Sequence, residues 1–206
     1  VWEESLAWGK KPAEKMLDPV FREAERRNIT AMIRESINHP SVILWGFCNE
    51  CASNEPEAIP VYKELTELVK KLDPSRPVTF AVIHSRDHVV FDFADVIAMN
   101  CYPGWYDTED EEIRTVDNIK PFLKETLAYI DSLPESRNKP FIISETGADA
   151  LSGFHDRFHA RWTEEYQTDF HREVTDFVCR EERVCGVALW MFCDTRTGMQ
   201  GRILRR

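Results

Sequence analysis

The sequence has no hydrophobic run long enough to cross a bilayer, little glycine and no excess of positive charge. A membrane span needs about 18 or more consecutive apolar residues, and no run here approaches that length. No secretory signal opens the sequence, so we expect no membrane partner. The 26 Lys and Arg residues are outnumbered by 36 Asp and Glu residues, and the net charge of −10 argues against nucleic acid, whose phosphates would require a basic face.

The sequence also lacks a convincing pattern for a metal or a nucleotide cofactor. Its 8 glycines form neither a dinucleotide-binding loop nor a phosphate loop, so we expect no cofactor. Cys48 and Cys51 have the CxxC spacing of a redox pair or of half a zinc site, but no second pair of ligands follows at a suitable distance. We interpret the cysteines as buried, reduced thiols, which favours a cytoplasmic protein without a metal. The remaining ones are Cys101, Cys179, Cys185 and Cys193.

Short apolar runs alternate with helical patterns along the whole chain. The runs are rich in β-branched and aromatic residues and apolar throughout, which is typical of parallel strands covered on both faces. They comprise residues 42–47, 78–83, 96–99, 141–144 and 184–192, and a strand tail is expected at residues 1–3. Apolar stripes with helical spacing predict helices around residues 61–72, 119–130 and 166–178, and a proline after Asp18 predicts another from there to about Asn38.

Repeated strand–helix units imply a parallel sheet, either doubly wound or closed into an eight-stranded barrel. The missing nucleotide-binding loop weakens the doubly wound alternative. A complete barrel takes about 250 residues, whereas this chain has 206 residues and five full predicted strands. We therefore predict an α/β fold with one catalytic domain over residues 1–206, namely an incomplete (β/α)8 TIM barrel without its first strands.

Two glutamates directly follow predicted strands. Glu50 comes after Asn49 at the end of the first full strand, and Glu145 follows residues 141–144. Chemistry in such barrels occurs at the carboxyl ends of the strands, so we expect the two side chains to face each other. Cleavage of a glycosidic bond requires such a pair, because one carboxyl protonates the leaving oxygen and the other attacks or activates water. A single glutamate after a strand would fit a surface position equally well.

Aromatic side chains follow two other strands and offer flat apolar surfaces for the CH faces of a sugar. The amide beside Glu50 is suited to bind a sugar hydroxyl. Trp105 and Tyr106 fit packing at the rim of the barrel as well as they fit sugar contacts. The candidates for binding the substrate are Asn49, Tyr102, Trp105, Tyr106 and Trp190.

These motifs resemble those of glycoside hydrolase family 2, which includes β-galactosidases, β-glucuronidases and β-mannosidases. Residues 38–45 followed by Asn49 and Glu50 resemble the acid/base signature of the family. Residues 144–148 resemble its nucleophile segment, and residues 100–106 resemble the segment that supplies its active-site tyrosine. Residues 162–167 are similar to a stretch typical of the β-glucuronidase branch. The segment 46–48 departs from many relatives, which carry Ser and Gly or Ala there.

The resemblance implies a retaining β-glycosidase that acts on terminal β-linked sugars, with β-glucuronidase and β-galactosidase as the preferred activities. It makes Glu50 the acid/base and Glu145 the nucleophile. Asn49 would bind the sugar 2-hydroxyl, Tyr102 would hydrogen-bond the nucleophile, and Trp190 would form part of the sugar floor.

Two alternatives remain beside this interpretation. One is another barrel glycosidase, such as a β-mannanase or a cellulase, which would prefer polymers to aryl monosaccharides. The other is an inactive carbohydrate-binding or assembly fragment. An open barrel leaves unpaired strand edges that favour association, so we expect a homo-oligomer.

Overall fold

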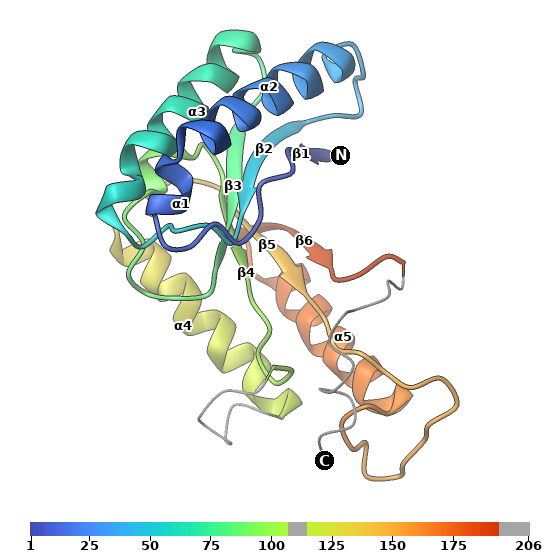
Figure 1. The fold of residues 1–206 in the computed structure, drawn as a ribbon. Coiled ribbons are helices and arrows are strands. Elements are labelled where there is room, and N and C mark those ends of the chain that lie inside the picture. Colours follow the sequence, from blue (N-terminus) through green and yellow to red (C-terminus); the bar gives the residue numbers. More distant parts are fainter. Residues whose placement is uncertain (107–114, 194–206) are drawn as a thin grey trace.

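The centre of the fold is one six-stranded parallel sheet whose strands follow each other in chain order (Figure 1). The computed structural model describes residues 1–106 and 115–193. Its strands are β1 (Trp2–Glu4), β2 (Leu44–Asn49), β3 (Val78–Ile83), β4 (Ile97–Asn100), β5 (Phe141–Thr146) and β6 (Val184–Leu189). Each strand pairs in parallel with the next one. The predicted α/β barrel with missing strands is confirmed, and the expected strand tail at the start of the chain is β1.

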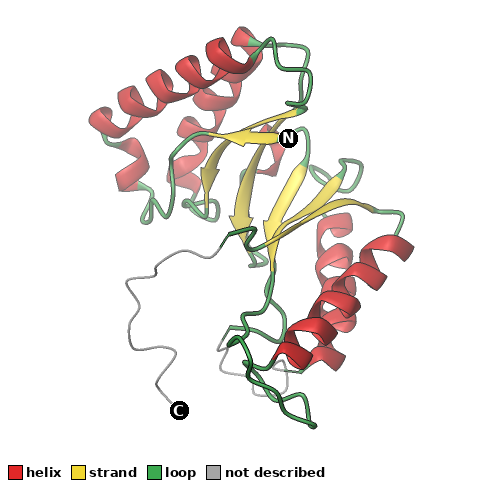
Figure 2. Ribbon diagram, turned by 90° about the vertical axis from the view of Figure 1, so that its right-hand side faces the viewer, coloured by secondary structure: helices red, strands yellow, loops and turns green. Residues whose placement is uncertain are grey.

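The helices cover one face of the curved sheet, and within the described part of the chain no helix lies against the opposite face (Figure 2). The sheet therefore forms a half-barrel whose concave side is the barrel interior. The α-helices are α1 (Glu14–Leu17), α2 (Pro19–Ser36), α3 (Ile59–Leu72), α4 (Ile119–Ser132) and α5 (Glu164–Arg180). The short 3-10 helices are η1 (Pro56–Ala58), η2 (Phe91–Phe93) and η4 (Val116–Asn118). Of the described helices, none has the length and apolarity that crossing a membrane demands.

Local capping explains where the two longest helices begin. The carboxylate of Asp18 accepts a hydrogen bond from the backbone N–H of Val20 at 2.8 Å, and Pro19 occupies the first turn of α2. The hydroxyl of Thr163 accepts from the backbone N–H of Tyr166 at 3.1 Å and caps α5. Because these caps satisfy N–H groups that have no partner within the helix, they fix the ends of the loops that lead from the sheet.

The main core lies between the sheet and the helices. Phe47 of β2 and Phe80 of β3 pack with ring centroids 5.3 Å apart, and Tyr62 of α3 packs against Phe80 at 4.7 Å. Trp45 is fully buried on the same side, and its indole N–H donates to Asp73 at 2.9 Å. These aromatic contacts join α3 to β2 and β3, so the ends of these strands are held firmly where the predicted active site lies.

Side chains alternate between the two faces of β1 and β2. Glu3 points outward, because the hydroxyl of Ser36 in α2 donates to its carboxylate at 2.9 Å. Trp2 and Glu4 therefore point toward the barrel interior. The indole of Trp2 occupies the space over Gly46, where any Cβ would collide with it. Gly46 is thus required by a close approach within the barrel.

Two sequence-based expectations need correction. The last strand ends at Leu189 instead of Phe192, whose side chain is fully exposed. Three cysteines are buried as predicted, but Cys179, Cys185 and Cys193 are exposed. Cys179 lies beside the buried stripe of α5 instead of within it. Cys185 lies on β6, which among the described strands pairs only with β5. The prediction of buried cysteines relied on apolar neighbours in the sequence. On the edge strand β6 such neighbours do not imply burial, because its side chains are less covered.

Candidate active site

The structure places Glu50 and Glu145 at the same end of the sheet, where the carboxyl ends of β2 and β5 lie. The backbone N–H of Glu50 donates to Ala81 of β3 at 2.9 Å, and the carbonyl of Glu145 accepts from Cys101 at 2.8 Å. Both glutamates are therefore fixed to the neighbouring strand through their backbone.

The end of β2 is irregular in a way that directs the side chains there. Its register with β3 shifts between Gly46 and Asn49, and Cys48 and Glu50 have positive φ angles of 66° and 52°. Such irregularities bend a strand and change the direction of its side chains. Non-glycine residues rarely adopt this conformation, and those that do are often found at functional sites.

Asn100, at the carboxyl end of β4, forms hydrogen bonds with residues at the ends of β2 and β5. Its side-chain N–H2 donates to Asn49 Oδ1 at 3.0 Å and to Glu50 Oε1 at 3.1 Å. Its own Oδ1 accepts from the hydroxyl of Ser144 at 2.7 Å, which fixes the amide with its donors toward β2. The sequence interpretation assigned no role to Asn100 or Ser144. The available signal was a polar side chain at the end of an otherwise apolar strand.

Glu145 is surrounded by hydrogen-bond donors. The hydroxyl of Tyr102 donates to its Oε2 at 2.6 Å, as the family resemblance implies. Burial raises the pKa of Glu145, and the charge of Glu50 adds to this, whereas hydrogen bonds from Tyr102, Asn100 and Asn49 oppose it. Burial and the bond to Glu145 raise the pKa of Tyr102, so the phenol stays neutral and donates. The pKa of Glu145 is raised on balance, and the hydrogen bonds limit that rise because they stabilise the carboxylate, the form in which a nucleophile attacks.

The four aromatic residues predicted to contact the sugar differ in solvent exposure: two are exposed, one is partly buried and one is buried. Tyr106 is 50% exposed and Trp190 is 49% exposed, whereas Tyr102 is partly buried. Tyr106 packs edge-on against Tyr102 with centroids 4.7 Å apart. Trp105 is only 4% exposed and packs against Trp162 at 4.7 Å, which favours the packing interpretation over a sugar contact.

Trp190 stays close to Glu145 through the backbone of the adjacent residues. Its N–H donates to the carbonyl of Thr146 at 2.8 Å. Its own carbonyl lies against Gly147, where any Cβ would collide with it. The small-residue turn after Glu145 is thus explained by the close approach of the segment that follows β6.

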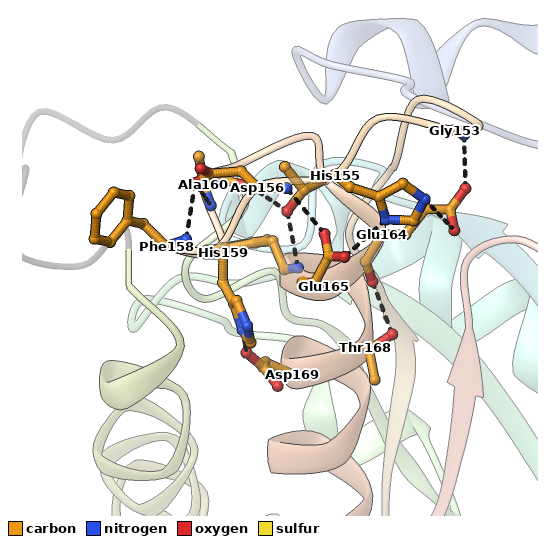
Figure 3. Close-up of polar contacts among 12 residues, drawn as sticks. Gly153, His155, Asp156, Phe158, His159, Ala160, Glu164, Glu165, Thr168 and Asp169 are labelled. Atoms are coloured by element: carbon orange, nitrogen blue, oxygen red, sulfur yellow. Dashed lines mark hydrogen bonds and ion pairs between the residues drawn. The ribbon is translucent and has the colours of Figure 1, made fainter.

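The loop that follows Glu145 is attached to the first turns of α5 by charged groups (Figure 3). His155 lies 2.7 Å from Glu165, and the backbone N–H of Gly153 donates to Glu164 at 2.7 Å. A further hydrogen bond joins the ring of His159 to the carboxylate of Asp169. The hydrogen bond and charge of Glu165 raise the pKa of His155. The long connection after the predicted nucleophile is therefore ordered by contacts with the helix that it leads to.

The segment 162–167 has a structural role that its sequence did not reveal. The amide of Gln167 donates to the carbonyl of Ala148 at 2.7 Å, within the turn after Glu145. The hydroxyl of Tyr166 donates to the carbonyl of Gly104 at 2.5 Å, within the loop that carries Tyr102 and Tyr106. One end of α5 thus holds both loops that border the site.

Within residues 1–106 and 115–193, no group of three or more His, Cys, Asp or Glu side chains is arranged to bind a metal. The site as described consists of carboxylates, amides, phenols and an indole. Such groups suit proton transfer and covalent attack on a polar substrate.

Comparison with known proteins identifies the family of this chain. The family described as "Glycosyl hydrolases family 2, TIM barrel domain" matches residues 5–202. A β-glucuronidase of Streptococcus agalactiae is 35% identical over 181 residues, which are 85% of this chain and 29% of that protein. The β-glucuronidase of Sus scrofa is 32% identical over 169 residues, covering 81% of this chain and 25% of that protein.

A solved structure with the same arrangement is the GH2 β-galacturonidase of Eisenbergiella tayi bound to galacturonate. It is 36% identical, has a TM-score of 0.85, and the match covers 95% of this chain and 34% of that one. The chain thus spans about a third or less of the length of these relatives. Because the family matches almost all of its residues, the chain belongs to glycoside hydrolase family 2 and forms part of the family's TIM-barrel domain.

Proposed function

We propose that this chain carries the catalytic carboxylates of a retaining β-glycosidase, with Glu50 as acid/base and Glu145 as nucleophile. The observation that supports this most is the network of hydrogen bonds at the end of the sheet. It joins Glu50 to Asn49 through Asn100 and places Tyr102 on Glu145. A double-displacement mechanism needs two carboxyl groups in different environments, and both glutamates lie at the carboxyl end of the sheet.

In this mechanism Glu145 attacks the anomeric carbon while Glu50 protonates the departing oxygen. The glycosyl–enzyme ester is then hydrolysed by water, from which Glu50 takes the proton, and the sugar leaves with its β configuration retained. Tyr102 and the two amides hold Glu145 in place before the attack. Asn49 is positioned beside Glu50, where a sugar hydroxyl would lie.

The proposed substrate is a terminal β-linked uronic acid, with β-glucuronides as the first choice. The relatives from Streptococcus agalactiae and Sus scrofa carry the name β-glucuronidase. These matches support the uronide over the neutral galactoside that the sequence also suggested. Tyr106 and Trp190, the two accessible aromatic rings, are the proposed sugar contacts of this chain.

A β-galacturonide is the second candidate substrate. The solved relative from Eisenbergiella tayi is a β-galacturonidase and is 36% identical to this chain. The two substrates share the carboxylate and differ in the configuration at C4. Groups that contact C4 therefore decide between them.

The test is hydrolysis of four 4-nitrophenyl β-glycosides by the full-length protein: glucuronide, galacturonide, galactoside and mannoside. We expect release from one of the two uronides at a rate at least about 100-fold above the neutral sugars, because a site that binds a buried carboxylate rejects substrates without one. Glu145→Gln should abolish release, and Glu135→Gln, an exchange far from the site, should not. Preference for a neutral sugar or for a polymer would contradict the proposed substrate.

A second experiment separates the roles of the glutamates. Glu50→Ala should slow a substrate with a poor leaving group far more than an activated aryl glycoside, because only the former needs a proton. Azide should partly restore the rate of this variant and give a β-glycosyl azide. Equal losses on both substrates without an azide product would argue against Glu50 as acid/base.

A further inference from the structure

An exposed indole lies beside the candidate site, on the segment that follows β1. The side chain of Trp8 is 68% exposed, whereas its neighbour Ala7 is 4% exposed and belongs to the buried core. Ala7 therefore faces the layer of helices, and Trp8 faces the open, concave side of the sheet (Figure 2). The sequence interpretation gave Trp8 no role, because a single tryptophan in a loop forms no motif.

Backbone hydrogen bonds fix Trp8 against the end of β2. The N–H of Asn49 donates to the carbonyl of Ala7 at 2.8 Å, and the N–H of Gly9 donates to the carbonyl of Asn49 at 2.9 Å. These two bonds make Trp8 the parallel partner of Asn49. Side chains of paired residues in a parallel ladder point to the same face of the sheet, so the indole of Trp8 and the amide of Asn49 share a face.

The contacts of Asn49 show that this face is the one that carries the candidate site. Its Oδ1 accepts a hydrogen bond from the side-chain amide of Asn100 at 3.0 Å, and the same amide donates to Glu50 Oε1 at 3.1 Å. The side chain of Asn49 thus points toward the group that also binds the proposed acid/base. The indole of Trp8, paired with Asn49 on the same face, borders the site on its β1 side.

The chemistry of this position fits the leaving group of a glycoside. In the proposed reaction Glu50 protonates the departing oxygen, so the leaving group lies on the Glu50 side of the bound sugar. An exposed indole there offers a flat apolar surface on which an aromatic ring can stack. A second sugar ring would instead bring several hydroxyl groups, for which the side chain of Trp8 has only one N–H. The position therefore favours an aromatic leaving group over a sugar.

We propose that Trp8 forms the subsite for the leaving group and stacks there on a flat aromatic ring. This inference rests on the proposed function and deepens it, because it names the class of substrate, namely β-uronides of phenols. The contact exists only while the leaving group is attached to the sugar or still bound. Trp8 therefore acts on binding of the glycoside and on formation of the ester with Glu145, but has no part in the hydrolysis of that ester.

The first test measures binding without turnover. Phenyl and methyl 1-thio-β-uronides, whose sulfur linkage resists hydrolysis, are titrated into the full-length protein in a calorimeter. Trp8→Ala should raise the Kd of the phenyl ligand about 5- to 10-fold and that of the methyl ligand less than about twofold, because only the phenyl ring reaches the indole. Trp8→Phe should bind the phenyl ligand within about threefold of wild type. An equal change for both ligands, or no change, would overturn the proposal.

Val20→Ala is the matched control, because Val20 is an apolar residue with 77% exposure in the first turn of α2, in the layer of helices. It should leave both Kd values unchanged. If Trp8→Ala does not fold, Trp8→Leu tests the same proposal, because leucine keeps an apolar side chain without a flat face. We expect Trp8→Leu to weaken the phenyl ligand at least about threefold more than the methyl ligand, and equal weakening would count against a stacking contact.

The second test measures the reaction. Trp8→Ala should lower kcat/KM about tenfold for a phenyl β-uronide and less than about twofold for a 2,2,2-trifluoroethyl β-uronide. For a dinitrophenyl β-uronide, whose turnover is limited by hydrolysis of the ester, kcat should stay within about twofold of wild type, since the leaving group has then departed. A loss by the same factor on all three substrates would indicate general damage to the site and overturn the proposal.

The two tests distinguish failure of this proposal from failure of the proposed function. If the enzyme hydrolyses uronides but Trp8→Ala affects the phenyl and trifluoroethyl substrates equally, the role of Trp8 is wrong and the glycosidase stands. If the thio-uronides bind with the expected difference but no glycoside is hydrolysed, the subsite is real and the proposed reaction is wrong. If neither thio-uronide binds, both proposals are wrong.

Discussion

The side-chain amide of Asn100 donates a hydrogen bond to Glu50 at 3.1 Å, although the two residues are 50 positions apart in the chain. A second hydrogen bond to Asn49, 3.0 Å long, makes this amide a clamp between β4 and the end of β2. The irregular backbone at Cys48 and Glu50 is therefore supported by Asn100 of β4 and by the backbone hydrogen bond from Glu50 to Ala81 of β3.

Asn100→Ala should reduce kcat/KM by about 10- to 100-fold, because Glu50 and Asn49 lose the donor that orients them. The loss should be mainly in kcat if the amide acts through the position of Glu50. Kinetics of the full-length enzyme with an aryl uronide measure it. Asn138→Ala, at an exposed turn, is the control. A rate within about twofold of wild type would show that the clamp has no part in the reaction.

Tyr102→Phe should move the acidic limb of the pH profile to higher pH. The hydrogen bond from Tyr102 lowers the pKa of Glu145, so its removal raises that pKa and protonates Glu145 at higher pH. The pH dependence of kcat/KM measures the shift. Tyr129→Phe, on the outer layer of helices, should leave the limb in place. If the acidic limb does not move in Tyr102→Phe, the titration of Glu145 does not cause that limb.

His155 should make the loop before α5 more ordered at pH 6 than at pH 8. The pKa of His155 is raised by Glu165, so its contribution is full below the ordinary histidine pKa of about 6.5 and is lost as the pH rises through the raised value. Hydrogen exchange of residues 147–163, expressed as protection factors, measures this. His155→Gln should remove the pH dependence. Equal protection of the wild-type loop at both pH values would contradict it.

Gln167→Ala should lower both activity and stability by modest amounts. Its amide holds the carbonyl of Ala148 in the turn after Glu145, and one such hydrogen bond contributes about 1 kcal/mol to stability. Denaturant unfolding and kcat/KM of the full-length protein measure the two effects. Thr168→Ala is the control, because Thr168 is the next residue of α5 and its exposed hydroxyl bonds only within the helix. Loss of stability with unchanged kcat/KM would show that the turn does not position Glu145.

Residues 1–206 expressed alone should self-associate. Within residues 1–106 and 115–193, β1 and β6 each pair with a strand on one side only. Apolar side chains near the end of β6 are exposed there, among them Leu189 at 48% and Trp190 at 49%. Unpaired edges with apolar neighbours favour association. Light scattering after size-exclusion chromatography measures the mass. A stable monomer would show that these edges do not drive assembly.

The fold was largely predictable from the sequence because its signals are local. The apolar runs at residues 78–83 and 141–144 lie within β3 and β5, and the stripe from Ile119 to Ile130 lies within α4. Both faces of a parallel strand are covered, so continuous apolar runs are a reliable sign of it. The last strand departs furthest from the prediction, since its apolar run continues for three residues beyond Leu189.

The candidate site was predictable only where a residue stands at the end of a strand within a known motif. Glu50, Glu145 and Tyr102 were predicted in this way, and the structure places all three at the carboxyl ends of their strands or just beyond. Asn100 was not, because its role depends on hydrogen bonds to Asn49 and Glu50, which are distant from it in the sequence. Trp105 shows the opposite problem. Its position in a loop after a strand made Trp105 a candidate sugar contact. The structure shows instead that Trp105 is buried by packing against Trp162, in the segment before α5.

The central claim is that Glu145 is the nucleophile, and trapping the covalent intermediate tests it most directly. The full-length enzyme is treated with an activated 2-deoxy-2-fluoro-β-uronide, digested, and the labelled peptide is sequenced by mass spectrometry. We predict one fluoroglycosyl group per active site, attached to Glu145, with loss of activity in the same proportion. A label on another carboxylate, or rapid turnover of aryl uronides with no trapped ester, would contradict the account.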